Sequence, residues 1–124
     1  MDKRIQLVED DDDIRFIIEY ILEDSDYQVE SFPNAKLFEA RPHKTDVDLV
    51  ILDVLLPDGN GIEICHDLKN DMFTKHIPVI VMSANIRSKQ MSEMAEPDDY
   101  ISKPFDLDDI ENRIKNLLER KKTA

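Results

Sequence analysis

The sequence contains little glycine and cysteine and no long apolar run. Of its 124 residues, two are glycine and one, Cys65, is cysteine. A lone cysteine cannot form a disulfide within the chain. No apolar run approaches the roughly 18 residues that a membrane span needs, and Met1 to Arg4 include no apolar stretch that could serve as a signal peptide. We therefore expect a cytoplasmic protein without a membrane partner.

Basic residues are also scarce. The chain has 16 Lys and Arg against 28 Asp and Glu, which gives a formal net charge of −12. Binding to a phosphate backbone or an anionic membrane needs an electropositive face. The one basic run, Arg120 to Lys122, is short and lies near the C-terminus. The composition therefore argues against direct binding of nucleic acid by this domain.

The apolar residues that are present follow the pattern of a folded α/β domain. Short apolar runs alternate with helical periodicity, which is typical of βα units around a parallel sheet. The expected strands are 5–8, 27–32, 49–52, 79–82 and 100–101, and the expected helices are 12–24, 34–40, 62–68, 86–94 and 107–120. We therefore predict that residues 1–124 form a single domain, a doubly wound (βα)5 sandwich. Its five-stranded parallel sheet would have the order 2-1-3-4-5.

Polar residues follow the expected strands where ligands bind in such sheets, at the carboxyl ends. Glu9 and Asp10 follow the first strand, Asp53 the third, Ser83 and Ala84 the fourth, and Lys103 the fifth. Neighbouring first and third strands would bring the three carboxylates together. At about 5 Å and an effective dielectric constant of about 20, each pair repels by roughly 3 kcal/mol. Such a cluster needs a counter-ion, and oxygen ligands on strand ends suit Mg²⁺, with Mn²⁺ as the alternative.

These groups have the parts needed for phosphoryl transfer. A divalent ion and the Lys103 ammonium can neutralise charge, and the Ser83 hydroxyl can donate a hydrogen bond. A carboxylate can itself be the nucleophile and form an acyl phosphate. Asp53 is the best candidate for that role, because its strand is the most central and the segment that holds both glycines follows it.

The two glycines and the acids near Glu9 also have plainer interpretations. We expect Gly59 and Gly61 to be turn residues in a loop that keeps backbone freedom and can approach a phosphoryl group without side-chain obstruction. Asp12 and Asp13 suit the first turn of a helix, where acids favour the helix dipole. Asp11 is left open between a solvated position and a contact with the site.

In these motifs the chain resembles the receiver domains of two-component response regulators, and the resemblance covers essentially the whole sequence. It implies the flavodoxin-like fold of that family and an Mg²⁺-dependent transfer of a phosphoryl group from a phosphohistidine. The donor would be a sensor histidine kinase or a phosphotransfer protein. The signal would pass to a downstream protein or to a fused effector domain not in this chain. The chain would be a signalling phosphoprotein, not an enzyme, and either a stand-alone receiver or a receiver cut from a longer regulator.

The resemblance also implies a role for each matching residue. Asp53 would be phosphorylated, and the metal ligands would be Glu9, Asp10, Asp53 and the backbone carbonyl of Leu55. The phosphoryl-binding and switch residues would be Ser83, Ala84, Lys103 and Tyr100, and the Lys103–Pro104 peptide bond would be cis.

Two segments depart from the family pattern. Glu96-Pro97 precedes Asp98-Asp99-Tyr100 where the family commonly has Gly-Ala. The fourth helix therefore loses a glycine C-cap, and we expect it to be short or irregularly ended. The second departure is the apolar Leu55, two residues after Asp53, with Asn85 two residues after Ser83. The resemblance implies that both positions affect the lifetime of the phosphoryl group.

Two other functions remain as alternatives. A phosphohydrolase of the haloacid-dehalogenase type also uses Mg²⁺ and an aspartyl nucleophile, but it needs a second Asp two residues later, where this chain has Leu55. A pseudo-receiver, which acts only as a protein-binding module, is expected to lack Glu9, Asp10, Asp53 or Lys103. This chain has all four.

Overall fold

The computed structural model describes residues 3–41, 46–84, 90, 93 and 95–123. Its main sheet has five parallel strands, β1 (Arg4–Val8), β2 (Gln28–Phe32), β3 (Leu49–Asp53), β6 (Val79–Ser83) and β7 (Asp99–Ser102). They lie in the order β2-β1-β3-β6-β7. This order confirms the predicted 2-1-3-4-5 topology, since β6 and β7 are the fourth and fifth strands of the sheet.

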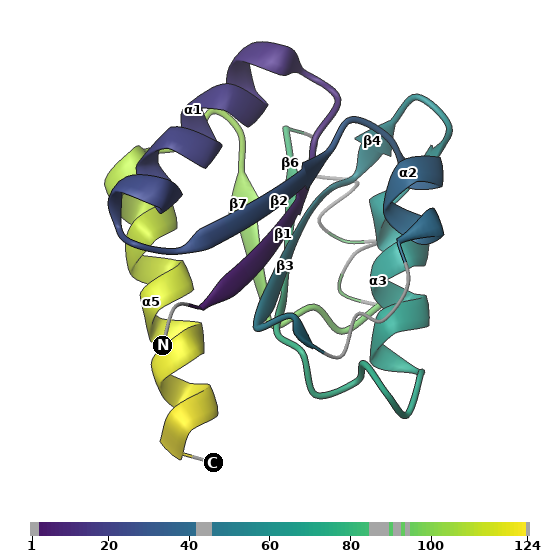
Figure 1. Cartoon of the computed structure of the whole chain (residues 1–124). Coiled ribbons are helices and arrows are strands. Elements are labelled where there is room, and N and C mark those ends of the chain that lie inside the picture. The colour runs from purple at the N-terminus through teal and green to yellow at the C-terminus, as the bar shows by residue number, and fades with distance from the viewer. Residues whose placement is uncertain (1–2, 42–45, 85–89, 91–92, 94, 124) are drawn as a thin grey trace.

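Helices cover both faces of this sheet (Figure 1). One face carries α1 (Asp12–Asp24) and α5 (Leu107–Thr123), and the other carries α2 (Ala35–Ala40) and α3 (Gly61–Lys69). Each face has its own apolar core. Because β3 and β6 are buried along their whole length, they tolerate apolar residues on both faces, as central parallel strands do.

Side chains with local hydrogen-bond acceptors set the helix starts. Asp11 caps α1, where its Oδ1 accepts hydrogen bonds from the amides of Asp13 at 2.9 Å and Ile14 at 3.0 Å. Asn34 caps α2, and Asn60 caps α3. These caps supply partners for amides that the first helical turn leaves unpaired. The position left open for Asp11 is therefore that of a helix cap.

The segment after Asp53 differs from the predicted loop. Residues Leu55–Leu56 (β4) and Gly59–Asn60 (β5) form a short antiparallel hairpin, and Gly61 begins α3. Neither glycine has a positive φ. The expectation that they supply backbone freedom was therefore wrong. What Gly61 provides is the absence of a side chain, since an ideal Cβ there would lie 2.1 Å from the carbonyl oxygen of Asp53.

The predicted fourth helix, 86–94, lies largely outside the described residues, as does Asn85. Immediately after it, Glu96 has a φ of 55°, in the left-handed region, and its amide donates to the carbonyl of Glu93 at 3.2 Å. Glu96 therefore takes a conformation that glycine adopts at lower cost. None of the described helices is long and apolar enough to cross a membrane.

The single cysteine should be chemically inert in the folded protein. Cys65 is fully buried on α3, and burial raises the pKa of its thiol to about 12. The thiolate is the reactive form, so we expect a disulfide reagent at about pH 8 to modify Cys65 only in urea. Complete modification of the folded protein on mixing would contradict this packing.

The end of α1 offers a test of backbone strain. Asp26 has a φ of 68°, and it follows Ser25, the C-cap, whose φ is −92°. A left-handed conformation costs an L-residue about 1 kcal/mol. We expect Asp26→Gly to raise the free energy of urea unfolding by up to about 1 kcal/mol. The control Ser25→Gly should lower it, because glycine there only adds freedom to the unfolded chain.

Candidate functional site

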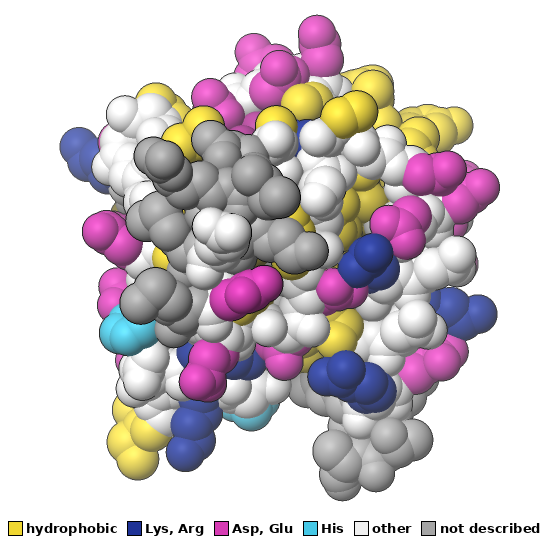
Figure 2. Space-filling view, turned by 180° about the vertical axis from the view of Figure 1, so that it is seen from behind, with side chains coloured by type: hydrophobic (Ala, Val, Ile, Leu, Met, Phe, Trp, Pro, Cys, Tyr) yellow, Lys and Arg dark blue, Asp and Glu magenta, His cyan; other side chains and the backbone are white. Residues whose placement is uncertain are grey.

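The carboxyl ends of β1 and β3 bring three carboxylates together. Glu9 follows β1 and is fully buried, Asp53 ends β3 with 5% exposure, and Asp10 is exposed beside them. One carboxylate oxygen from each residue lies within 4.8 Å of the others. Figure 2 shows Asp and Glu side chains gathered at the top of the molecule, the end toward which the parallel strands of Figure 1 point. The site therefore lies at an acidic end of the domain.

A lysine from the fifth strand end bridges two of these carboxylates. The Nζ of Lys103 lies 2.7 Å from Oε1 of Glu9 and 3.1 Å from Oδ2 of Asp53. The ammonium therefore supplies a positive charge where two buried carboxylates meet, and such carboxylates need a paired charge. The peptide bond between Lys103 and Pro104, which follows it, is cis.

Glu9 reaches its buried position through hydrogen bonds on both its backbone and its side chain. Its amide donates to the carbonyl of Phe32 at 3.0 Å, and its carbonyl accepts from Arg15 at 2.8 Å. Its Oε2 accepts from the amide of Asp11 at 3.2 Å. Burial raises the pKa of Glu9, and its contact with Asp53 raises it further, whereas Lys103 opposes the shift. Folding therefore holds this carboxylate where its charged form is disfavoured.

The pKa values of the neighbouring charges shift for related reasons. Partial burial raises the pKa of Asp10, as do the hydrogen bond and charge of Glu9. Burial by itself lowers the pKa of Lys103, but the hydrogen bond to Glu9 and the charge of Asp53 outweigh it and raise that pKa overall. The cluster therefore favours an added positive charge.

The remaining predicted residues lie around this cluster. Ser83 is 3% exposed at the end of β6, and its carbonyl accepts from the Lys103 amide at 2.9 Å and from the Tyr100 hydroxyl at 3.3 Å. Ala84 follows it and is exposed. Leu55 begins β4 with a side chain that is 68% exposed, and its amide donates to Oδ1 of Asp53 at 3.3 Å. The structure thus brings the ends of β1, β3, β6 and β7 and the start of β4 to one place.

The donor set fits a divalent cation. Carboxylate oxygens on semi-rigid strand ends are the ligands that Mg²⁺ prefers, and Glu9, Asp10 and Asp53 offer three of them close together. Three ionised carboxylates beside one bridging ammonium carry more negative than positive charge. The group can therefore hold a metal ion.

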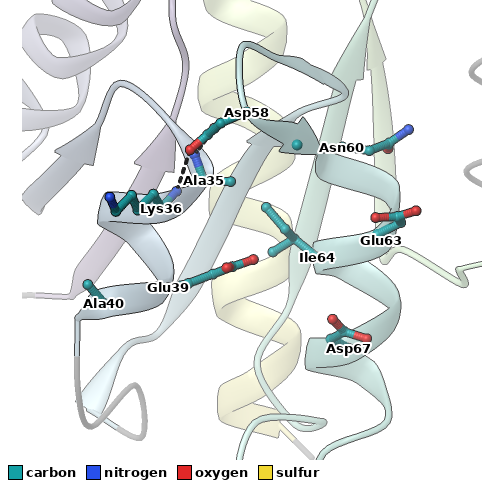
Figure 3. Close-up of a pocket in the computed structure, with 10 residues that line it drawn as sticks. Ala35, Lys36, Glu39, Ala40, Asp58, Asn60, Glu63, Ile64 and Asp67 are labelled. Atoms are coloured by element: carbon teal, nitrogen blue, oxygen red, sulfur yellow. Dashed lines mark hydrogen bonds between the residues drawn. The ribbon is translucent and has the colours of Figure 1, made fainter.

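A separate cavity of about 450 Å³ opens between α2 and α3 (Figure 3). Carboxylates of Glu39, Asp58, Glu63 and Asp67 line it. Asp58 accepts hydrogen bonds from the amides of Ala35 at 2.8 Å and Lys36 at 2.9 Å, so its charge is used to start α2. These amide donors lower the pKa of Asp58. Lys36 also lines this cavity, but none of the described residues that line it carries a side-chain hydroxyl like that of Ser83.

Comparison with known proteins agrees with this geometry. The family model described as the response regulator receiver domain matches residues 5–115. The chain belongs to the response regulator receiver family. Receiver domains are phosphoryl acceptors in two-component signalling, so the function expected from the sequence is confirmed at this level.

Individual relatives show the same relationship. The phosphate regulon transcriptional regulatory protein PhoB of Escherichia coli is 35% identical over 97% of this chain and 53% of its own length. Histidine kinase P4 of Formosa agariphila is 34% identical over 94% of this chain and 9% of its own length. The response regulator DrrB of Thermotoga maritima superposes with a TM-score of 0.87 at 30% identity, covering 98% of this chain and 54% of that one. The chain thus spans about half of the matched regulators and a small part of the kinase.

The sequence did not predict two features of the site. One is the close approach of Gly61 to the main chain of Asp53, although the glycine count drew attention to the correct segment. The other is the contact of the Arg15 side chain with the carbonyl of Glu9, which no motif indicated. Both depend on how helices sit against strand ends.

The raised pKa of Glu9 generates a test of the cluster without metal. A carboxylate whose pKa is higher in the folded state lowers stability as the pH rises above its unfolded value. With a chelator present to remove metal ions, we expect the free energy of urea unfolding to be higher for Glu9→Gln than for wild type at about pH 7.5. The difference should shrink as the pH falls through the raised pKa of Glu9, because the wild-type side chain then takes up a proton. A constant difference across this range would contradict the assigned cause.

Proposed function

We propose that Asp53 is the phosphoryl acceptor of this receiver domain. The observation that carries this proposal is the position of its carboxylate, which is nearly buried at the end of the central strand β3. It lies 3.1 Å from the Lys103 ammonium and within reach of the oxygens of Glu9 and Asp10. This is the arrangement that phosphoryl transfer to an oxygen nucleophile requires.

Glu9, Asp10 and Asp53 would hold Mg²⁺, or Mn²⁺ in its place, together with the backbone carbonyl of Leu55. When bound, the ion would neutralise the carboxylates and the oxygens of the incoming phosphoryl group. The chain's own residues orient the acceptor. The Leu55 amide holds one oxygen of Asp53, and Lys103 holds the other.

In the transfer step, a carboxylate oxygen of Asp53 attacks the phosphorus of a phosphohistidine on a sensor histidine kinase or phosphotransfer protein. The bond between phosphorus and the imidazole nitrogen breaks, and the nitrogen keeps the electron pair. Lys103 pairs with a phosphoryl oxygen of the acyl phosphate, and the Ser83 hydroxyl donates to another. Asp53 is thus modified, while the chain acts on no separate substrate.

The switch would begin at Ser83. In this structure the Tyr100 hydroxyl donates to the Ser83 carbonyl. Movement of Ser83 toward a phosphoryl group changes the surroundings of that bond and lets Tyr100 turn inward. The switch is then a shift in population toward the arrangement that binds the phosphoryl group better, and the altered surface signals to a downstream protein or a fused effector domain.

We further propose that residues 1–124 are one receiver module that works in the cytoplasm. Continuous parallel pairing from β2 to β7 supports the single module. Receiver domains of relatives such as PhoB occupy part of longer regulators, so a fused effector is one form that the output could take.

Phosphorylation of the purified domain tests the acceptor. Incubation with Mg²⁺ and acetyl phosphate should add the mass of one HPO3 group to wild type, and Asp53→Asn should add none, because its amide is a poor nucleophile. Asp13→Asn is the matched control, since Asp13 is an exposed acid in the first turn of α1. It should label as wild type does. Labelling that survives Asp53→Asn would overturn the assignment.

A further inference from the structure

Gly61 lies against the main chain of the proposed acceptor. A Cβ built on Gly61 would lie 2.1 Å from the carbonyl oxygen of Asp53, 2.9 Å from its carbonyl carbon and 3.2 Å from Cα of Val54. All three atoms belong to the backbone, so no side-chain rotation can remove the overlap. Any residue other than glycine at this position must displace the start of α3 or the Asp53–Val54 peptide.

The two peptide groups that follow Asp53 are each held by a backbone hydrogen bond. The amide of Val54 donates to the carbonyl of Met82 in β6 at 3.0 Å, and the carbonyl of Val54 accepts from the amide of Gly61 at 2.9 Å. Beyond it, the Leu55 amide donates to Oδ1 of Asp53 at 3.3 Å. The carboxylate position therefore follows the position of this peptide.

The start of α3 is held as well. The Asn60 side chain accepts from the amide of Ile62 at 2.7 Å. Ile64 and Cys65 are buried against the sheet one turn further on. The helix cannot retreat from Asp53 without breaking the hydrogen bond from the Gly61 amide to the Val54 carbonyl and exposing apolar surface.

We propose that Gly61 is a positioning residue for the acceptor: its missing side chain lets the first turn of α3 clamp the Asp53–Val54 peptide, which sets where the Asp53 carboxylate stands. This inference rests on the proposed role of Asp53. Restoring an ordinary contact distance would displace the peptide by about 1 Å, and a misplacement of that size can slow a reaction about 100-fold.

Intrinsic helix propensity predicts the opposite result. Alanine is a better helix former than glycine, and Gly61 has no positive φ that only glycine favours. If Gly61 were simply the first residue of a helix, Gly61→Ala would stabilise the protein and leave its chemistry unchanged.

The chain's other glycine is the matched control. A Cβ on Gly59 would lie 3.1 Å from the side-chain Cβ of Ala35, and Gly59 also lacks a positive φ. Gly59→Ala therefore adds the same methyl group two residues away without meeting the acceptor. Asn60→Ala is a second control, since it loses the α3 cap and some stability but places nothing against Asp53.

The experiment compares wild type with Gly61→Ala, Gly59→Ala and Asn60→Ala. The Mg²⁺ dissociation constant is obtained from the increase in unfolding free energy with Mg²⁺ concentration. The rate of labelling by acetyl phosphate at saturating Mg²⁺ is measured by mass spectrometry. All four proteins are studied with and without trimethylamine N-oxide, which favours the folded state, so that a weakly folded variant can be compared.

We expect Gly61→Ala to bind Mg²⁺ more weakly and to be labelled about 100-fold more slowly when folded. Both controls should keep wild-type values, although Asn60→Ala is less stable. Unchanged Mg²⁺ affinity and labelling rate in folded Gly61→Ala would overturn the inference, and so would equal losses in Asn60→Ala. If wild type binds Mg²⁺ but is never labelled, the proposed function fails, whereas weaker Mg²⁺ binding confined to Gly61→Ala would still support the positioning role.

Discussion

The contact between the Lys103 ammonium and the carboxylates of Glu9 and Asp53 is the interaction on which the site depends. These groups come from the ends of three strands, and two of them are almost completely removed from solvent. Their carboxylate oxygens lie within 4.8 Å of one another. Buried carboxylates that close repel one another strongly unless a positive charge stands between them. The lysine supplies one such charge, and burial still raises the pKa of Glu9 despite it. The three close carboxylates therefore favour the addition of a cation.

Backbone hydrogen bonds give this cluster its rigidity. Val54, directly after Asp53, donates from its amide to Met82 on the neighbouring strand and accepts at its carbonyl from Gly61 at the start of α3. The Ser83 carbonyl is bonded to Lys103 and Tyr100, so β6 and β7 are joined just beyond the acceptor. A parallel sheet suits such a site because it fixes several strand ends side by side, while the helices that follow each strand can be placed against them. Asp53, the proposed acceptor, is therefore followed by backbone that is hydrogen-bonded to both β6 and α3.

Much of the fold and several residues of the site could be predicted from the sequence. The apolar run before Asp53 and the helical spacing after Asp11 each depend on the local period of burial, which is visible in one dimension. The hairpin at residues 55–60 was missed because two-residue strands leave no period to detect. The role of Gly61 was also missed, because the atoms that exclude a side chain there belong to Asp53 and Val54, earlier in the chain. The spacing of residues in the sequence does not show that Gly61 lies against the main chain of Asp53 and Val54.

The sequence by itself thus determined the βα alternation, the strand order typical of its family and the polar residues at four of the five strand ends. Those properties follow from local periodicity and residue type. Only the tertiary structure decided that Lys103 bridges Glu9 and Asp53 and that Gly61 needs no backbone freedom. Each of these depends on distances between atoms that are remote along the chain or on a dihedral angle, and such quantities are set when the helices pack onto the sheet.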